Sequence, residues 1–159
     1  MILSGHLSAA YMVGEALHVD RRGYWAASMF PDFVDKPIRW LLALTPNDRI
    51  PAHSLTALAT TTVVADRLVG GRFATGWVVG YTSHLLCDEL NAQINAGKVY
   101  WFWPWKRYTL HRGPTGLKSS LADFSSQALL IELALTVLGL LIWVSRCRPS
   151  HQPLMRNVS

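Results

Sequence analysis

Apolar residues recur along this chain at intervals of three and four positions, and no stretch of any length alternates with the two-residue period of a strand. Ser4 is placed to cap a first helix that begins near Gly5. The pair Gly70-Gly71 and the later Gly97 are stop signals for two further helices. The pattern therefore predicts an all-α fold. The expected helices cover residues 5–19, 38–44, 52–69, 73–96 and 128–144.

The pattern is interrupted after the first helix. Residues 20–30 read as a break followed by one or two helical turns. Pro31 and Pro37 bound a segment that we expect to be a loop, because each proline pushes the preceding residue out of the helical region. Loops of this kind often present ligands from a rigid scaffold. Asp32 is then a candidate ligand and Asp35 a candidate cap of the next helix, although the two roles could be exchanged.

The last apolar segment differs from the others. From Ala128 to Val144 its only charge is Glu132, and Ser145-Arg-Cys-Arg148 follows. A helix of this length rises roughly 26 Å, which is near the lower limit for crossing the hydrocarbon layer. A buried core helix is the alternative, because Glu132 is costly in lipid. The terminal position and the flanking arginines favour a membrane helix.

Composition supports contact with a membrane. Half of the 159 residues are hydrophobic and only 16% are charged, against about 25% in ordinary soluble domains. The net charge of +5 is spread out and forms no basic stripe, so nucleic-acid binding is not expected, whereas membrane lipid with anionic headgroups is a fitting partner. The start of the chain lacks the features of a cleaved export signal. A main domain in the cytoplasm, anchored by its tail, is the simpler interpretation.

His84 and Asp88 are the strongest candidates for chemistry. Four residues apart, they lie one above the other on one helical face, where an imidazole nitrogen and a carboxylate oxygen can share a metal ion. The same face continues through Asn91 and Asn95, and a stripe facing solvent is the alternative interpretation. Histidine with carboxylate suits zinc, manganese or iron better than calcium. The residues that could complete the set of ligands are His6, Asp32 and His53.

A second distinct patch is aromatic and basic. The run Tyr100-Trp-Phe-Trp-Pro-Trp105 is followed by Lys106 and Arg107. This patch could enter the bilayer interface and place a phospholipid near the metal, with the cations at the level of the phosphate. Core packing of the large rings is an equal alternative. The candidate substrate contacts are Trp103, Lys106, Arg107 and Arg112.

Taken in order, these motifs resemble a known family. An early Gly-His6 helix, Phe-Pro-Asp32, His53-Ser-Leu, Gly-Tyr-x-x-His84-x-x-x-Asp88 and Trp-Pro-Trp are similar to those of the LexA-regulated, inner-membrane metal-dependent hydrolases (YdjM-like). The resemblance covers roughly residues 5–108. That family looks distantly related to zinc-dependent phospholipase C and the zinc single-strand nucleases.

The resemblance implies a helical bundle of the zinc phospholipase C type. It also implies a first metal held by Asp32, His53, His84 and Asp88, with Asp88 bridging toward a second metal and His6 contributing. Two departures limit the analogy. The second acid follows Asp32 by three residues rather than two, and no HxxxE follows the HxxxD helix. We therefore expect one or two ions, Zn²⁺ or else Mn²⁺ or Fe²⁺, or a site that has lost its activity.

The leading hypothesis is a metal-dependent hydrolase acting on a phosphate ester, such as a phospholipid, at the inner membrane. Asp32 or Asp35 would accept a proton from water, and Lys106, Arg107 or Arg112 would steady the phosphate charge. The alternative is a non-catalytic small membrane protein with a structural metal site or a partner-binding role. The expected parts are a metal-binding, hydrolase-like domain, an apolar helix and a polar basic tail, in residues 1–122, 123–146 and 147–159.

Overall fold

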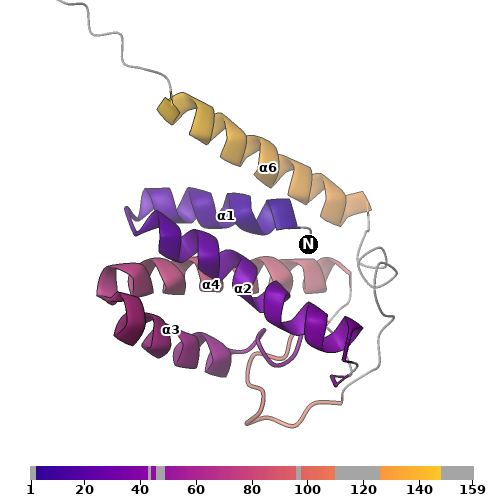
Figure 1. Ribbon diagram of the computed structural model, residues 1–159. Helices are drawn as coiled ribbons and strands as arrows, with labels where there is room; N and C mark the ends of the chain where they lie inside the picture. Colours follow the sequence, from indigo (N-terminus) through magenta and orange to yellow (C-terminus); the bar gives the residue numbers. More distant parts are fainter. Residues whose placement is uncertain (1–2, 43, 46–48, 96–97, 110–125, 148–159) are drawn as a thin grey trace, which may run out of the picture.

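The computed structural model describes residues 3–42, 44–45, 49–95, 98–109 and 126–147. Within these ranges the chain forms five helices and no strand, which confirms the all-α fold class. Helices α1 to α4 form a bundle, and α6 lies outside it, alongside α1 (Figure 1). The helices are α1 (Leu3–Ala16), α2 (Arg21–Trp40), α3 (Leu55–Val69), α4 (Gly71–Ile94) and α6 (Ser126–Cys147).

Helix α2 corrects the prediction of a loop. It runs without a break from Arg21 to Trp40 and contains both Pro31 and Pro37, so neither the loop over residues 31–37 nor a separate helix over 38–44 exists. An internal proline removes one helical hydrogen bond and crowds the preceding turn. The most extensive packing in the bundle, between α2 and α4, offsets this cost, and the Pro31 ring is itself buried in the helix.

Glycines set how closely α2 and α4 approach. A Cβ atom added at Gly80 of α4 would collide with the backbone of Tyr24, and one added at Gly23 of α2 would collide with the carbonyl of Phe73. The two helices therefore touch backbone to backbone. This contact brings the carbonyl of Ser28 on α2 within hydrogen-bond reach of α4.

The remaining helix boundaries shift less. Helix α3 begins at Leu55 rather than Ala52, because the Ser54 side chain caps it by accepting a hydrogen bond from Ala57 N. His53 therefore precedes the helix instead of lying in its first turn. Ser4 does not cap α1 but lies within it, and its hydroxyl donates to Glu132 of α6.

Helix α6 is the one described helix long and apolar enough to cross a membrane. Its span from Gln127 to Cys147 has a mean hydropathy of 2.3, and only 17% of it is buried against the rest of the chain. This exposure favours a membrane helix over a buried core helix. The expected domain boundary near residue 122 and the tail beyond Cys147 lie outside the described residues.

Candidate metal centre

The bundle brings the five predicted ligands to one place. His6 comes from α1, Asp32 from α2, and His84 and Asp88 from α4, while His53 precedes the first residue of α3 by two positions. Four of the five side chains are buried, and that of Asp32 is partly exposed. Most of the polar stripe of α4 therefore faces away from solvent: His84, Asp88 and Asn91 are buried, and Asn95, directly after the helix, is half-buried.

Three of these residues converge most closely. His53 Nε2 lies 3.1 Å from both His84 Nε2 and Asp88 Oδ2, and His84 Nε2 lies 3.4 Å from the same carboxylate oxygen. One donor atom from each of the three falls within 4.8 Å of the other two. A second set with the same spread consists of His6, Asp32 and His84.

His6 closes the cluster from the α1 side. Its ring stacks on that of His84 with a centroid separation of 3.9 Å, and its Nε2 lies 3.6 Å from Asp88 Oδ1. Burial and the nearby His84 charge lower the pKa of His6 well below its ordinary value. His6 is therefore neutral at physiological pH, which is the protonation state that a metal ligand requires.

Hydrogen bonds on the far side of two imidazoles place a proton on Nδ1 of each ring. Nδ1 of His84 lies 2.6 Å from the Ser28 carbonyl, an oxygen that can only accept a hydrogen bond, so Nδ1 carries the proton. Nδ1 of His53 donates in the same way to Asp35 Oδ2 at 2.7 Å. In both rings Nε2 faces the centre, as in metal sites whose histidines are oriented by outer partners.

Asp35 holds His53 and its backbone in place. The Asp35 carboxylate is completely buried and accepts hydrogen bonds from the backbone N–H groups of Ala52 and His53 as well as from the His53 ring. It caps no helix at Pro37, because α2 continues through that position. No local sequence pattern indicates this contact, because it joins positions on different segments.

Opposite charges in the cluster outweigh the effect of burial. Burial raises the pKa of Asp88, yet hydrogen bonds from His53 and His84 hold that pKa well below its usual value. Burial lowers the pKa of His53, but the surrounding carboxylates of Asp32, Asp35 and Asp88 raise it well above the usual value. Without a metal, His53 thus carries the positive charge that balances its carboxylate neighbours.

The donor set fits a divalent metal. Buried charged groups in proteins are paired with one another or coordinate metals. Here imidazole nitrogens and carboxylate oxygens, without a thiolate, converge in one buried cluster. Zinc, manganese and ferrous iron accept such mixed nitrogen and oxygen donors. His53, His84 and Asp88 are the best-placed trio, with His6 and Asp32 adjoining it.

Asp32 is the more accessible acid of this group. Its side chain is 13% exposed, whereas that of Asp35 is completely buried. Lys36 Nζ lies 2.6 Å from Asp32 Oδ2, and the other oxygen lies 3.6 Å from His53 Nε2. Burial raises the pKa of Asp32, but the neighbouring His53 ring and the charges of His84 and Lys36 bring it below the usual range.

The aromatic segment covers the start of α3. The Trp101 carbonyl accepts from Leu55 N, and the Trp103 carbonyl accepts from the Thr56 hydroxyl. The segment is thus anchored directly after His53. Trp103 is half-buried, Lys106 lies over the Tyr108 ring, and Arg107 is exposed. Arg112 lies outside the described residues.

A donor that the charge pattern did not single out lies one turn beyond Asp88. Asn91 is 1% exposed, its Oδ1 accepts from Asn95 Nδ2, and its own Nδ2 has no hydrogen-bond partner among the described residues. Asn95 Nδ2 also donates to the Asn91 carbonyl, which fixes the orientation of both amides. A buried donor of this kind is suited to an oxygen of a bound ligand.

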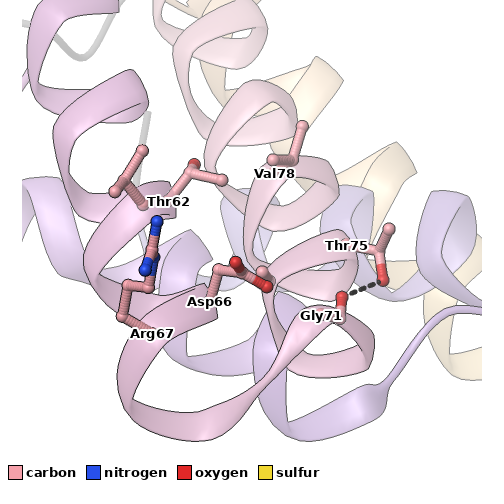
Figure 2. A pocket seen from close by; sticks show the side chains of 8 residues that line it. Thr62, Asp66, Arg67, Gly71, Thr75 and Val78 are labelled. Atoms are coloured by element: carbon pink, nitrogen blue, oxygen red, sulfur yellow. Dashed lines mark hydrogen bonds between the residues drawn. The ribbon is translucent and has the colours of Figure 1, made fainter.

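The surface also has an open hollow of about 380 Å³ between α3 and α4, at the turn that joins them (Figure 2). None of the predicted site residues lines it, and it contains no histidine. The residues labelled in its wall are Thr62, Asp66, Arg67, Gly71, Thr75 and Val78.

Comparison with known proteins identifies a family. A family model described as YdjM inner membrane protein matches residues 1–150, which include all five candidate ligands and the apolar helix. No curated protein and no solved structure matches the chain.

Proposed function

The chain belongs to the YdjM inner membrane protein family, and from this premise we propose that it is a metal-dependent hydrolase of phosphate esters at the inner membrane. The observation that supports the proposal is the convergence of His53, His84 and Asp88, with His6 and Asp32 beside them. In this proposal α6 anchors the protein and the helical domain lies on the cytoplasmic side. A phospholipid is the substrate that this location favours.

The residues of the cluster have different roles in this proposal. His53, His84 and Asp88 would hold a first divalent ion of the zinc class, and His6 and Asp32 would help to hold a second. Such an ion supplies Lewis acidity toward a phosphoryl oxygen and lowers the pKa of water from 15.7 to about 7. Asp35 and the Ser28 carbonyl keep the two imidazoles turned toward the centre.

Asp32 is the better candidate for proton acceptor. Both oxygens of Asp35 already accept hydrogen bonds from Ala52 and His53, and the side chain is completely buried, so Asp35 is poorly placed to accept a proton from water. Asp32 is partly exposed, is ionised at neutral pH and reaches the cluster. The Asn91 amide would donate to a ligand oxygen. The cations Lys106, Arg107 and Arg112 would attract the phosphate.

One observation favours a second candidate function, a membrane protein with a structural metal. His6, His53 and His84 are each at most 2% exposed, and Asp88 is 5% exposed. Structural metal sites are closed in this way, whereas catalytic sites keep an open position for water or substrate. A structural ion would tie α1, α2 and α4 together without turnover.

Hydrolysis of a chromogenic phosphodiester by the purified full-length chain in detergent separates the two candidates. We expect turnover with zinc or manganese that disappears with a chelator and in His84→Ala. The matched control is His18→Asn, because His18 is exposed, has a φ of 56° that asparagine tolerates, and lies outside the cluster. Stoichiometric metal without turnover on any phosphoester would contradict the hydrolase and support the structural role.

A further inference from the structure

Glu132 is the one charge in the apolar stretch of α6 between residues 128 and 144. Most of α6 is exposed, yet the Glu132 side chain is only 4% exposed. A carboxylate in a membrane helix is costly unless it is bonded to a partner. Its Oε1 oxygen lies 3.0 Å from the Ser4 hydroxyl and 3.1 Å from the backbone nitrogen of Gly5, both on α1.

The hydrogen bond from Gly5 N gives a partner to a backbone N–H group in the first turn of α1. The first N–H groups of a helix have no acceptor within the helix, and a negative charge is favoured at this end by the helix dipole. Glu132, on α6, supplies both the missing acceptor and the negative charge. The costly charge in α6 and the unsatisfied start of α1 therefore compensate one another.

The residue that follows Gly5 is His6. Its ring stacks on His84 and its Nε2 lies 3.6 Å from Asp88 Oδ1, so its place in the cluster depends on where the first turn of α1 lies. Glu132 fixes the backbone of that turn one residue before His6. A chain of contacts thus joins α6 to the metal centre.

A second polar contact joins α6 and α1 at the other end. The two helices run side by side in the same direction (Figure 1), and Arg146 near the end of α6 pairs with Glu15 near the end of α1. This pair ties the same two helices but lies far along α1 from His6. It provides a matched control for the contact made by Glu132.

We propose that Glu132 is a positioning residue, which couples the apolar helix to the metal centre by holding the turn of α1 that carries His6. The effect on metal binding rests on the proposed metal centre. The effect on the position of His6 does not.

Zinc affinity of the full-length chain in micelles, measured by competition with a chromophoric chelator, gives the first test. Glu132→Leu keeps α6 apolar but removes the acceptor, and we expect it to weaken zinc binding about tenfold. Glu132→Gln keeps an acceptor oxygen and should retain most of the affinity. Arg146→Gln should also retain it. In a His6→Ala background, Glu132→Leu should cause no further loss.

The second test needs no metal. In the metal-free chain labelled at histidine, the NMR signal of the His6 ring should shift in Glu132→Leu and stay in place in Arg146→Gln. Unchanged zinc affinity in Glu132→Leu, an equal loss in the His6→Ala background, or an unmoved His6 signal would each overturn the proposal. If the wild-type chain binds no zinc, the proposed function fails, and the His6 signal still decides the role of Glu132.

Discussion

The Oδ2 oxygen of Asp35 lies 2.7 Å from Nδ1 of His53, and both side chains are almost completely buried. This bond fixes the proton on Nδ1 and turns Nε2 toward Asp88 and His84. Because Asp35 also accepts hydrogen bonds from two backbone N–H groups, one carboxylate fixes both the orientation of the His53 ring and the position of the backbone that carries it.

Replacing Asp35 should therefore weaken metal binding. The Asp35 carboxylate accepts from three donors, which are the backbone N–H groups of Ala52 and His53 and the His53 ring. In Asp35→Asn an amide NH₂ group replaces one of the accepting oxygens, so the His53 ring loses its fixed orientation. We expect zinc affinity to fall about 10-fold to 100-fold, the cost usual for outer partners of metal ligands. Competition titration with a chelator measures it. Asp66→Asn, in the hollow between α3 and α4, should leave the affinity unchanged. Equal affinity in Asp35→Asn would remove Asp35 from this role.

Metal binding should release a proton from His53. In the metal-free chain the carboxylates of Asp32, Asp35 and Asp88 around His53 outweigh burial and raise the pKa of His53 well above its ordinary value, so the ring is charged at pH 7. A metal at Nε2 must displace that proton, and affinity should therefore fall as the pH is lowered. Calorimetry in two buffers of different ionisation enthalpy should report about one proton released per zinc at pH 7. Binding without proton release would contradict the assignment of Nε2 as a ligand.

A second pH effect should come from Glu15, far from the cluster. The hydrogen bond from Arg21, aided by Tyr24 and Arg146, lowers the pKa of Glu15 to about 2 from 4.5, against the opposing effect of burial. A lowered pKa in the folded state stabilises the protein above the unfolded pKa, and this stabilisation is lost as the pH falls toward 2. Glu15→Gln should thus lower the unfolding midpoint at pH 7 by about 3 °C.

Thermal unfolding in micelles between pH 7 and pH 3 tests this expectation. The gap between wild type and Glu15→Gln should narrow below the unfolded pKa of 4.5. Glu89→Gln is a suitable control, because the Glu89 side chain on α4 accepts its hydrogen bond from the exposed side chain of Gln93, four residues later, rather than from an arginine. A gap that stays constant across this range would show that the charge of Glu15 is not the cause.

The sequence was sufficient for the helical class and the apolar helix, but not for α2. Local rules place a loop between Pro31 and Pro37, and they are sound for an isolated segment. What they omit is the packing of α2 on α4, which depends on glycines such as Gly80 that admit the neighbouring backbone. The packing of α2 on α4 cannot be predicted from the seven residues of the expected loop alone, because the glycines that permit it lie elsewhere in the sequence.

The candidate site divides in the same way. His84 and Asp88 could be paired from their spacing on one helix, since that relation is local. The contacts of His53 with Asp35 and of Glu132 with Gly5 join distant segments, so only the assembled bundle reveals them. The same holds for the Ser28 carbonyl, whose bond to His84 depends on the close approach of α2 and α4.

Elemental analysis of the purified full-length chain tests the metal centre most directly. We expect one or two zinc, manganese or iron ions per wild-type chain and a clear loss in His84→Ala and Asp88→Ala, with full content retained in His18→Asn. Metal content below stoichiometry in the wild type after purification with added metal, or equal content in all four proteins, would contradict it.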